Sequence, residues 1–381
     1  MCSAQDSINS TTEDRQVTMP PRNLICLSVD ALQAGMLGPY GNAWIRTPAV
    51  NRLASQSLVF DQAFACEPSL DAVLRQSWPA EIFAGRRATL LTDDRAAESH
   101  VATSVFADKH YCEPGNVATA AAIEDTEIGM LLGQAAELIR EAAEPFALWI
   151  HSRGMTGLWD APYEFREQYA DEEDPPPPDF VKPPERLLAR DYDPDELLGI
   201  QQAYVGQTSA FDACLGALVA ALDDSAFAQD TLLVLLGTRG FPLGEHLRVG
   251  FCDAALYNEL THVPLIVRSA DRVRALERSQ SLVTQADLLA LLQGKPLPSR
   301  DHLRFHSPHN CAIRTPAWYL RESNGREHPH HELYAKPGDR YEVNNVADRC
   351  PEIVAQLAEV LATSPGEITQ PLSEALVAAL D

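Results

Sequence analysis

Three stretches of the sequence carry side chains that could take part in chemistry. The first is an apolar run from Asn23 to Val29 that stops at a carboxylate, Asp30. Continuous Val, Ile and Leu runs are typical of strands buried on both faces of a parallel sheet, and ligands meet such sheets at the carboxyl ends of their strands. Asp30 is therefore placed to meet a metal ion or a substrate. The alternative is that Asp30 only caps the turn that follows, because Asp is a common capping residue.

The second stretch runs from Ala65 to Arg75 and indicates a turn that enters a helix. The exposed backbone amides at the start of a helix could hold a nucleophile there. The third stretch is His151-Ser152-Arg153, which follows an apolar run over residues 145–150. These three residues are expected at the end of another buried strand.

Segments typical of helices and of buried strands alternate along the chain. A helix followed by a strand indicates a crossover unit of a parallel sheet. The helices are marked by apolar residues at helical spacing, and the first also by a Thr-Pro start. We expect strands at 23–29, 58–60, 88–92, 145–150 and 231–236, and helices from Thr47-Pro48, over 126–143 and over 197–222.

Two regions depart from this alternation. Residues 159–195 are acidic and rich in proline, which predicts an irregular excursion on the surface. A lid that faces the substrate and a solvated loop are both open interpretations. Beyond about residue 298 the chain changes to short aromatic strands, 318–320 and 332–334, and a helix over 352–361. This pattern predicts a small α+β C-terminal subdomain.

Length and charge restrict the class of protein. A chain of 381 residues suggests one large α/β domain, alone or with a smaller one. With 30 Lys and Arg against 54 Asp and Glu, the net charge of −24 opposes binding to nucleic acid or to an anionic membrane. Residues 1–22 are polar and predict a disordered tail rather than a signal peptide, and no run approaches the ~18 apolar residues of a membrane span.

The cysteines agree with this class. All 8 are scattered without a C-x-x-C pair, which favours reduced thiols over a disulfide framework or a zinc site. We therefore expect a soluble cytoplasmic protein that binds neither nucleic acid nor membrane.

Four separated motifs, in order, resemble those of the sulfatases of the alkaline phosphatase superfamily. The resemblance covers most of residues 23–350 and implies an α/β/α sandwich with a mixed, mostly parallel sheet over 23–297, plus a small C-terminal subdomain over 298–381. The motifs are Ser28-Val29-Asp30 with Gly38-Pro39-Tyr40-Gly41, Thr47-Pro48 with Asn51-Arg52-Leu53-Ala54, Leu243-Gly244-Glu245-His246, and Thr261-His262-Val263-Pro264-Leu265-Ile266.

The resemblance implies hydrolysis of sulfate esters, and this sequence departs from the residues that the reaction needs. The family holds a divalent cation, usually calcium, with oxygen ligands that are mostly carboxylates. Here Asp30 is followed by Ala31 where the family has paired acids, and Thr238 and Arg239 occupy the positions of its later Asp-His or Asp-Asn pair. Arg239 would place a cation where the metal should lie, so we expect no bound metal. Instead, Arg239 is expected to pair with Asp30.

The family's nucleophile is a formylglycine made from the Cys of a C-x-P-S-R motif, and two registers are open here. In one, the segment 66–70 keeps Cys66 but has Leu70 in place of the Arg. In the other, which we prefer, the segment 71–75 keeps Arg75 but offers Asp71, which cannot become formylglycine. His151 occupies a position where the family contacts its substrate; a surface or hydrogen-bonding role is the alternative.

Two functional hypotheses follow from these departures. One is a catalytically silent member of the family that acts by binding, because Asp30, Arg75 and His151 provide too few oxygen ligands for calcium. The other is an active hydrolase of sulfate or phosphate esters with altered ligands. The partner is a small anionic ester or a protein, and the sequence identifies neither.

Overall fold

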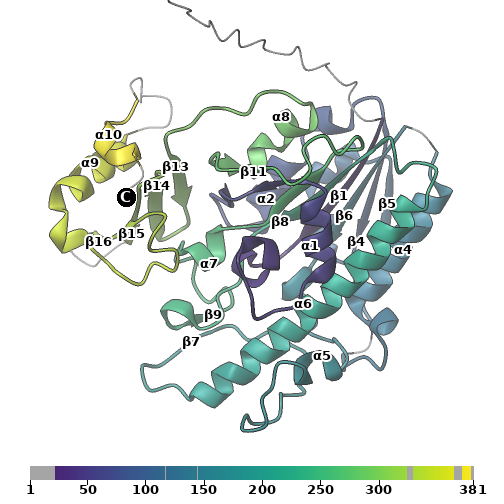
Figure 1. Ribbon diagram of the computed structural model, residues 1–381, viewed down its shortest axis with the longest axis horizontal. Coiled ribbons are helices and arrows are strands. Elements are labelled where there is room, and N and C mark those ends of the chain that lie inside the picture. Colours follow the sequence, from purple (N-terminus) through teal and green to yellow (C-terminus); the bar gives the residue numbers. More distant parts are fainter. Residues whose placement is uncertain (1–21, 116, 144, 324–328, 364–370, 379–381) are drawn as a thin grey trace, which may run out of the picture.

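An eight-stranded sheet forms the centre of the molecule (Figure 1). The computed structural model describes residues 22–115, 117–143, 145–323, 329–363 and 371–378, so the predicted tail over 1–22 lies outside them except for its last residue. The strand order is β11 (Arg278–Ser279), β2 (Leu58–Phe60), β10 (Leu265–Arg268), β8 (Thr231–Gly237), β1 (Asn23–Val29), β6 (Phe146–Ser152), β4 (Arg87–Thr92) and β5 (Asp108–Tyr111).

All pairings in this sheet are parallel except the two that β10 makes with β2 and β8. The predicted mixed, mostly parallel sheet is therefore confirmed. β1 lies between β6 and β8, and its last residue, Val29, is level with Ser152 and Gly237. Asp30, Arg153 and Thr238 consequently leave the sheet side by side at one edge.

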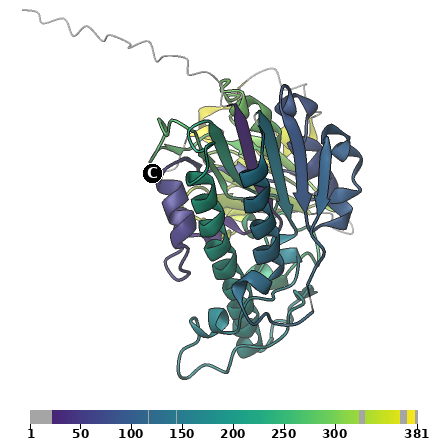
Figure 2. The same ribbon diagram turned by 90° about the vertical axis from the view of Figure 1, so that its right-hand side faces the viewer.

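Helices cover both faces of the sheet, as the views in Figures 1 and 2 show. One apolar cluster joins the sheet to α1 (Pro48–Ser55), α4 (Glu127–Glu141) and α6 (Pro194–Asp223). A second joins the opposite face to α2 (Leu70–Ser77), α3 (Arg95–Glu98) and α8 (Leu288–Leu292). These layers confirm the α/β/α sandwich.

Helix α6 is long and apolar enough to cross a membrane, unlike what the sequence led us to expect. However, 67% of its most apolar window is buried inside the protein. Its apolar residues pack in the same cluster as α4 and the sheet. We therefore interpret α6 as a core helix.

The acidic, proline-rich excursion carries two short elements, α5 (Glu164–Glu167) and β7 (Arg186–Leu187), and β7 pairs with β9 (Arg248–Val249). Arg166 anchors it from inside: its side chain is buried and donates to the backbone carbonyls of Trp159, Pro178 and Phe180. A single buried guanidinium thus satisfies three carbonyl groups of a segment with little regular structure.

The C-terminal part is a four-stranded antiparallel sheet with helices on one side (Figure 1). The two strands and the helix that the sequence predicted there are present, and two further strands precede them. The elements are β13 (Leu303–His306), β14 (Asn310–Arg314), β15 (Trp318–Ser323), β16 (His330–Ala335), α9 (Pro351–Ala362) and α10 (Glu374–Val377). Smaller elements elsewhere are β3 (Ala63–Phe64), α7 (Asn258–Thr261) and β12 (Val283–Thr284).

Candidate functional site

Asp30 and Arg239 form a two-pronged ion pair at the edge where β1 and β8 end. Arg239 Nε donates to Asp30 Oδ1 at 2.9 Å, and Nη2 donates to Oδ2 at 2.8 Å. The Thr238 hydroxyl donates to Oδ1 at 2.5 Å, and the Ala31 N–H donates to the same oxygen at 3.1 Å. The pairing of Arg239 with Asp30 that the sequence led us to expect is present.

Surrounding groups fix the Arg239 side chain. Its guanidinium carbon lies 3.7 Å from the centre of the Phe251 ring, and Nη1 is 3.4 Å from the carbonyl oxygen of Pro68. Only 3% of the Asp30 side chain and 18% of the Arg239 side chain are exposed. Burial alone would raise the pKa of Asp30, but the charge and hydrogen bonds of Arg239 and the Thr238 hydroxyl outweigh it and lower that pKa. Asp30 is therefore ionised at neutral pH.

This arrangement does not fit a calcium ion. Calcium takes six to eight oxygen ligands. Asp30 is the only carboxylate among the residues that surround the pair in the contacts above, and both of its oxygens already accept hydrogen bonds. Within the described ranges, no group of three or more His, Cys, Asp or Glu side chains is placed to hold a metal ion.

Asp93 and Asp94 follow β4 at the same edge of the sheet, and the sequence analysis missed them. Asp93 is 3% exposed; its Oδ1 accepts from the Arg153 N–H at 2.7 Å, and the Ser152 hydroxyl lies 3.4 Å from Oδ2. Burial raises the pKa of Asp93 to about 6. The signal was available, because the two acids directly follow the strand predicted at 88–92, just as Asp30 follows the first strand.

Arg153 pairs with Glu127 at the start of α4. Its Nη2 lies 2.7 Å from both carboxylate oxygens of Glu127, whose side chain is 4% exposed. Glu127 Oε2 also accepts from the Leu158 N–H at 3.0 Å. This ion pair ties the end of β6 to α4 and to the beginning of the excursion.

His151 lies inside β6 rather than beyond its end. The strand continues to Ser152, so the imidazole points onto a face of the sheet, where it has no exposed surface and packs against Trp78. His151 Nδ1 is 3.0 Å from the Ser28 hydroxyl, and Nε2 is 3.7 Å from Asp94 Oδ2, which is beyond hydrogen-bond distance. A ring in this position has no direct access to a dissolved substrate.

The segment 66–75 presents its two nucleophile candidates in different surroundings. Asp71 is on the surface, where it accepts two hydrogen bonds from Arg75 and lies 2.9 Å from His100 Nε2. These partners lower the pKa of Asp71 to about 2. Cys66 is partly buried, and burial raises the pKa of its thiol to about 12, so it carries little of the reactive thiolate at neutral pH.

The structure thus brings together Asp30, Thr238 and Arg239, with Pro68 of the nucleophile segment beside them. It does not add the remaining candidates to that cluster. His151 is within the sheet, and Asp71 and Arg75 form an exposed pair with 60% and 57% of their side chains accessible.

Comparisons with known proteins agree on one family. A family model described as Sulfatase matches residues 103–293, half of the chain. Iduronate 2-sulfatase of Homo sapiens is 24% identical over 355 residues, covering 72% of this chain and 63% of that protein. Arylsulfatase K of Gallus gallus is 25% identical over 220 residues, covering 49% and 40%. The chain therefore spans less than two thirds of the length of these curated relatives.

The fold has solved counterparts over nearly its whole length. The phosphonate monoester hydrolase of Agrobacterium radiobacter superposes with a TM-score of 0.69 at 15% sequence identity, covering 89% of this chain and 94% of that one. At this identity the similarity concerns the fold alone.

Proposed function

The chain belongs to the sulfatase family, and from that premise we propose that it is a catalytically silent member that acts by binding an anionic ester or a protein partner. The observation that carries the proposal is the Arg239 guanidinium on both oxygens of Asp30. A fixed cation there takes the coordinating atoms that a metal would need. A protein can keep this fold without the activity, because function depends on the site rather than on the fold.

The nucleophile candidates support the same proposal. Neither Cys66 nor Asp71 lies in a complete C-x-P-S-R motif, so we expect no formylglycine. The thiol of Cys66 is protonated at neutral pH, and the carboxylate of Asp71 is engaged by Arg75 on the surface. The competing hypothesis, an active hydrolase with altered ligands, would need an activated nucleophile next to the Asp30–Arg239 pair.

A hydrolysis assay tests this proposal. The purified protein should release no product from an aryl sulfate or an aryl phosphate above the buffer rate, with or without millimolar calcium, magnesium or manganese. Elemental analysis should find no stoichiometric divalent metal, and mass spectrometry of the peptide containing Cys66 should find the unmodified thiol even after co-expression with a formylglycine-generating enzyme.

The control variant is Asp30→Asn, which keeps the size of the side chain and removes its charge. Hydrolysis that scales with protein concentration and disappears in Asp30→Asn would contradict the proposal and favour the active hydrolase. Hydrolysis that persists unchanged in Asp30→Asn would indicate a contaminating enzyme. The hydrolytic activity should then separate from the protein on a further column.

A further inference from the structure

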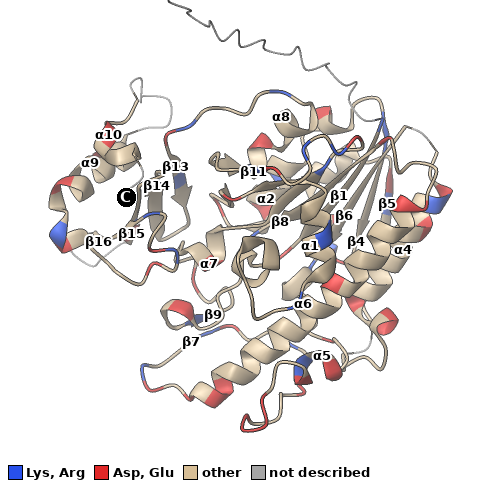
Figure 3. Ribbon diagram, in the orientation of Figure 1, with Lys and Arg blue, Asp and Glu red and all other residues tan. Residues whose placement is uncertain are grey.

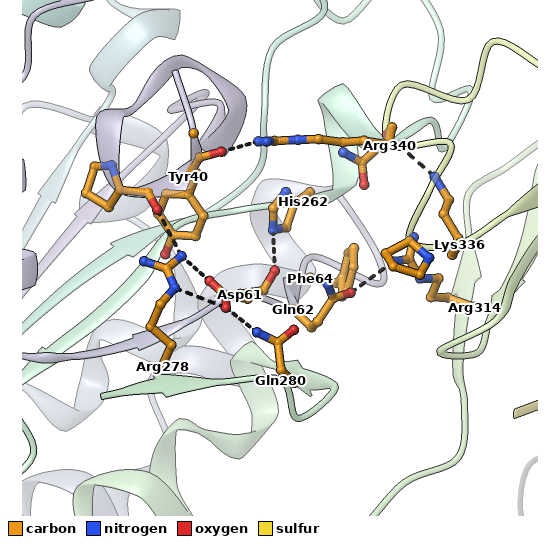
Figure 4. Close-up of a pocket in the computed structure, with 14 residues that line it drawn as sticks. Tyr40, Asp61, Gln62, Phe64, His262, Arg278, Gln280, Arg314, Lys336 and Arg340 are labelled. Carbon is orange, nitrogen blue, oxygen red and sulfur yellow. Dashed lines mark hydrogen bonds and ion pairs between the residues drawn. The ribbon is translucent and has the colours of Figure 1, made fainter. Parts of the chain in front are cut away.

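A pocket of about 380 Å³ lies between the large sheet and the C-terminal subdomain (Figure 4). One side is formed by residues 39–41 and the chain that follows β2, and the other by Arg314 of β14 and the segment 336–340. Neither Asp30 nor Arg239 lines it. The pocket is therefore separate from the site described above.

Four cationic side chains line this pocket. The protein as a whole is acidic, and Asp and Glu residues are spread along the chain (Figure 3). Two of the four cations are neutralised by carboxylates. Arg278 forms an ion pair with Asp61, and Lys336 Nζ lies 2.9 Å from Glu342 Oε1. The charges of the other two, Arg314 and Arg340, decide what the pocket can bind.

Arg314 is a buried cation without an ion pair. Its residue is 5% exposed, yet among the described residues no carboxylate lies within ion-pair distance of it and Nε has no hydrogen-bond acceptor. Its guanidinium donates from Nη2 to Gln62 Oε1 at 3.0 Å and lies 5.3 Å from the centre of the Phe64 ring. Glu342 acts on it electrostatically, but the Glu342 oxygens are engaged by Lys336 and the Asn258 N–H.

Burying a guanidinium without a partner carboxylate costs free energy, and this cost lowers the pKa of the buried group. Burial lowers the pKa of Arg314 to about 10, which still leaves it charged at neutral pH. Burial, reinforced by the nearby Arg314 charge, also lowers the pKa of His262 to about 3. His262 is therefore neutral at both pH 5 and pH 8, and it adds no charge to the pocket at either pH.

Arg340 lies opposite, in the segment after β16. Its Nη2 donates to the backbone carbonyl of Tyr40, which fixes the guanidinium beside the pocket wall formed by residues 39–41 (Figure 4). Within the described ranges Arg340 also has no carboxylate at ion-pair distance. The pocket thus presents two positive charges that the protein itself does not neutralise.

We propose that this pocket binds a phosphate monoester, with Arg314 and Arg340 as the residues that contact its phosphate group. Two unpaired guanidinium groups match the charge of a phosphate monoester dianion, and planar guanidinium groups bind tetrahedral oxyanions through paired hydrogen bonds. The net charge of −24 repels anions over most of the surface, so binding of a dianion needs such a local concentration of cations. A sulfate monoester carries one charge fewer and should bind less tightly.

This inference names a ligand class for the binding role proposed above and rests on it only to that extent. The two can fail separately. Hydrolysis at Asp30 would contradict the proposed function and leave the pocket untouched, whereas failure of the pocket to bind an anion would leave the absence of hydrolysis untouched.

Isothermal titration calorimetry with phenyl phosphate and phenyl sulfate, at constant ionic strength and pH 8, tests the inference. Phenyl phosphate should bind saturably and at least about tenfold more tightly than phenyl sulfate. The Arg340→Gln variant should weaken phenyl phosphate binding at least about tenfold, which corresponds to about 1.4 kcal/mol. Lowering the pH to 5, below the second phosphate pKa of about 6, should weaken the binding of phenyl phosphate more than that of phenyl sulfate.

The matched control is Arg87→Gln, which removes the same charge from an exposed ion pair with Asp108 outside the pocket. It should bind phenyl phosphate as the wild type does. Arg314→Met is a second pocket variant, used if circular dichroism shows that it folds; Arg340 is partly exposed and tests the inference without it. No saturable binding by the wild type, equal affinity for the two esters, or equal losses in Arg340→Gln and Arg87→Gln would overturn the inference.

Discussion

Burial distinguishes two ion pairs of the same geometry in this protein. Arg239 donates hydrogen bonds to Asp30 from Nε and Nη2 at 2.9 and 2.8 Å. Arg75 donates to Asp71 from the same two atoms at 2.8 and 3.0 Å. The first pair is 3% and 18% exposed, and the second is more than half exposed on both sides. Solvent screens the exposed pair, whereas loss of one partner of the buried pair leaves an uncompensated charge.

We therefore predict that Arg239→Ala lowers the free energy of unfolding by about 3–5 kcal/mol at neutral pH, because it leaves the Asp30 carboxylate buried without its partner. The matched change Arg75→Ala should cost much less, because solvent screens that exposed pair. Urea unfolding of the two variants and the wild type measures both values. The double variant Asp30→Asn with Arg239→Ala should recover part of the loss.

A change of less than about 0.5 kcal/mol in Arg239→Ala would show that the pair is not the buried contact described here. Equal losses in Arg239→Ala and Arg75→Ala would lead to the same conclusion, since the two pairs differ mainly in burial.

The pKa of Asp93 shifts in the opposite direction to that of Asp30. Burial raises it to about 6, above the value of about 4 in an unfolded chain. Between these values the folded protein retains a proton that the unfolded chain has released. The contribution of Asp93 to stability therefore falls as the pH rises from about 4 to about 6, and it stays low above that range.

We predict that Asp93→Asn raises the free energy of unfolding at pH 8 by about 2–3 kcal/mol and leaves it nearly unchanged at pH 4, from about 1.4 kcal/mol per unit of pKa. The amide oxygen can still accept from the Arg153 N–H. Urea unfolding at the two pH values measures this. The control is Asp108→Asn, because Arg87 lowers the pKa of Asp108 and its neutralisation should not stabilise the protein at pH 8. Equal or lower stability of Asp93→Asn at pH 8 would contradict the prediction.

At the level of the elements, the hydrophobic pattern predicted which segments form buried strands and which form helices. The buried strands at 23–29, 58–60 and 231–236 and the helices α4 and α6 are found within a few residues of their expected bounds. Their order across the sheet is a property of long-range pairing and is not written in any local pattern. Short strands such as β13 and β14 lack a long apolar run, so they were not identified individually.

The length of β6 shows how an error of two residues changes a functional interpretation. The apolar run ends at Ile150, but the strand continues through His151 and Ser152. Successive side chains of a strand point to opposite faces, so a residue inside the strand faces a layer of the sandwich rather than the ligand edge. The sequence could not reveal this because the Ser28 hydroxyl, which lies beside His151, comes from the neighbouring strand.

At the level of the whole molecule, the sulfatase resemblance predicted the architecture, and Arg239, which departs from the family's pattern, was correctly expected to pair with Asp30. The phosphate pocket could not have been predicted in this way. Its cations come from positions 278, 314, 336 and 340, and those of the C-terminal subdomain meet Arg278 only because that subdomain packs on the large sheet.

An apolar cluster joins the two parts of the chain. It combines Phe64 and the segment 255–257 of the large domain with residues of the C-terminal sheet, including Phe305, Tyr319 and Tyr334. The Phe305 ring lies 5.6 Å from that of Phe64 and 5.8 Å from that of Tyr319, in edge-to-face contact with both. Separation at the predicted boundary near residue 298 would expose both halves of this cluster to water.

We predict from this shared cluster that the molecule unfolds as one cooperative unit. Phe305→Ala should lower the free energy of unfolding by about 3–5 kcal/mol, the usual cost of deleting a buried aromatic side chain. Native-state hydrogen exchange can follow the slowest amides of β8 in the large sheet and of β15 in the C-terminal sheet, and both should lose protection by the same amount. Leu320→Ala, a control in an apolar cluster formed only by C-terminal residues, should give the same parallel loss if the unit is cooperative. Unchanged protection in β8 beside a large loss in β15 would mean that the two parts open independently, and the pocket between them would then have to be regarded as a contact between separate domains.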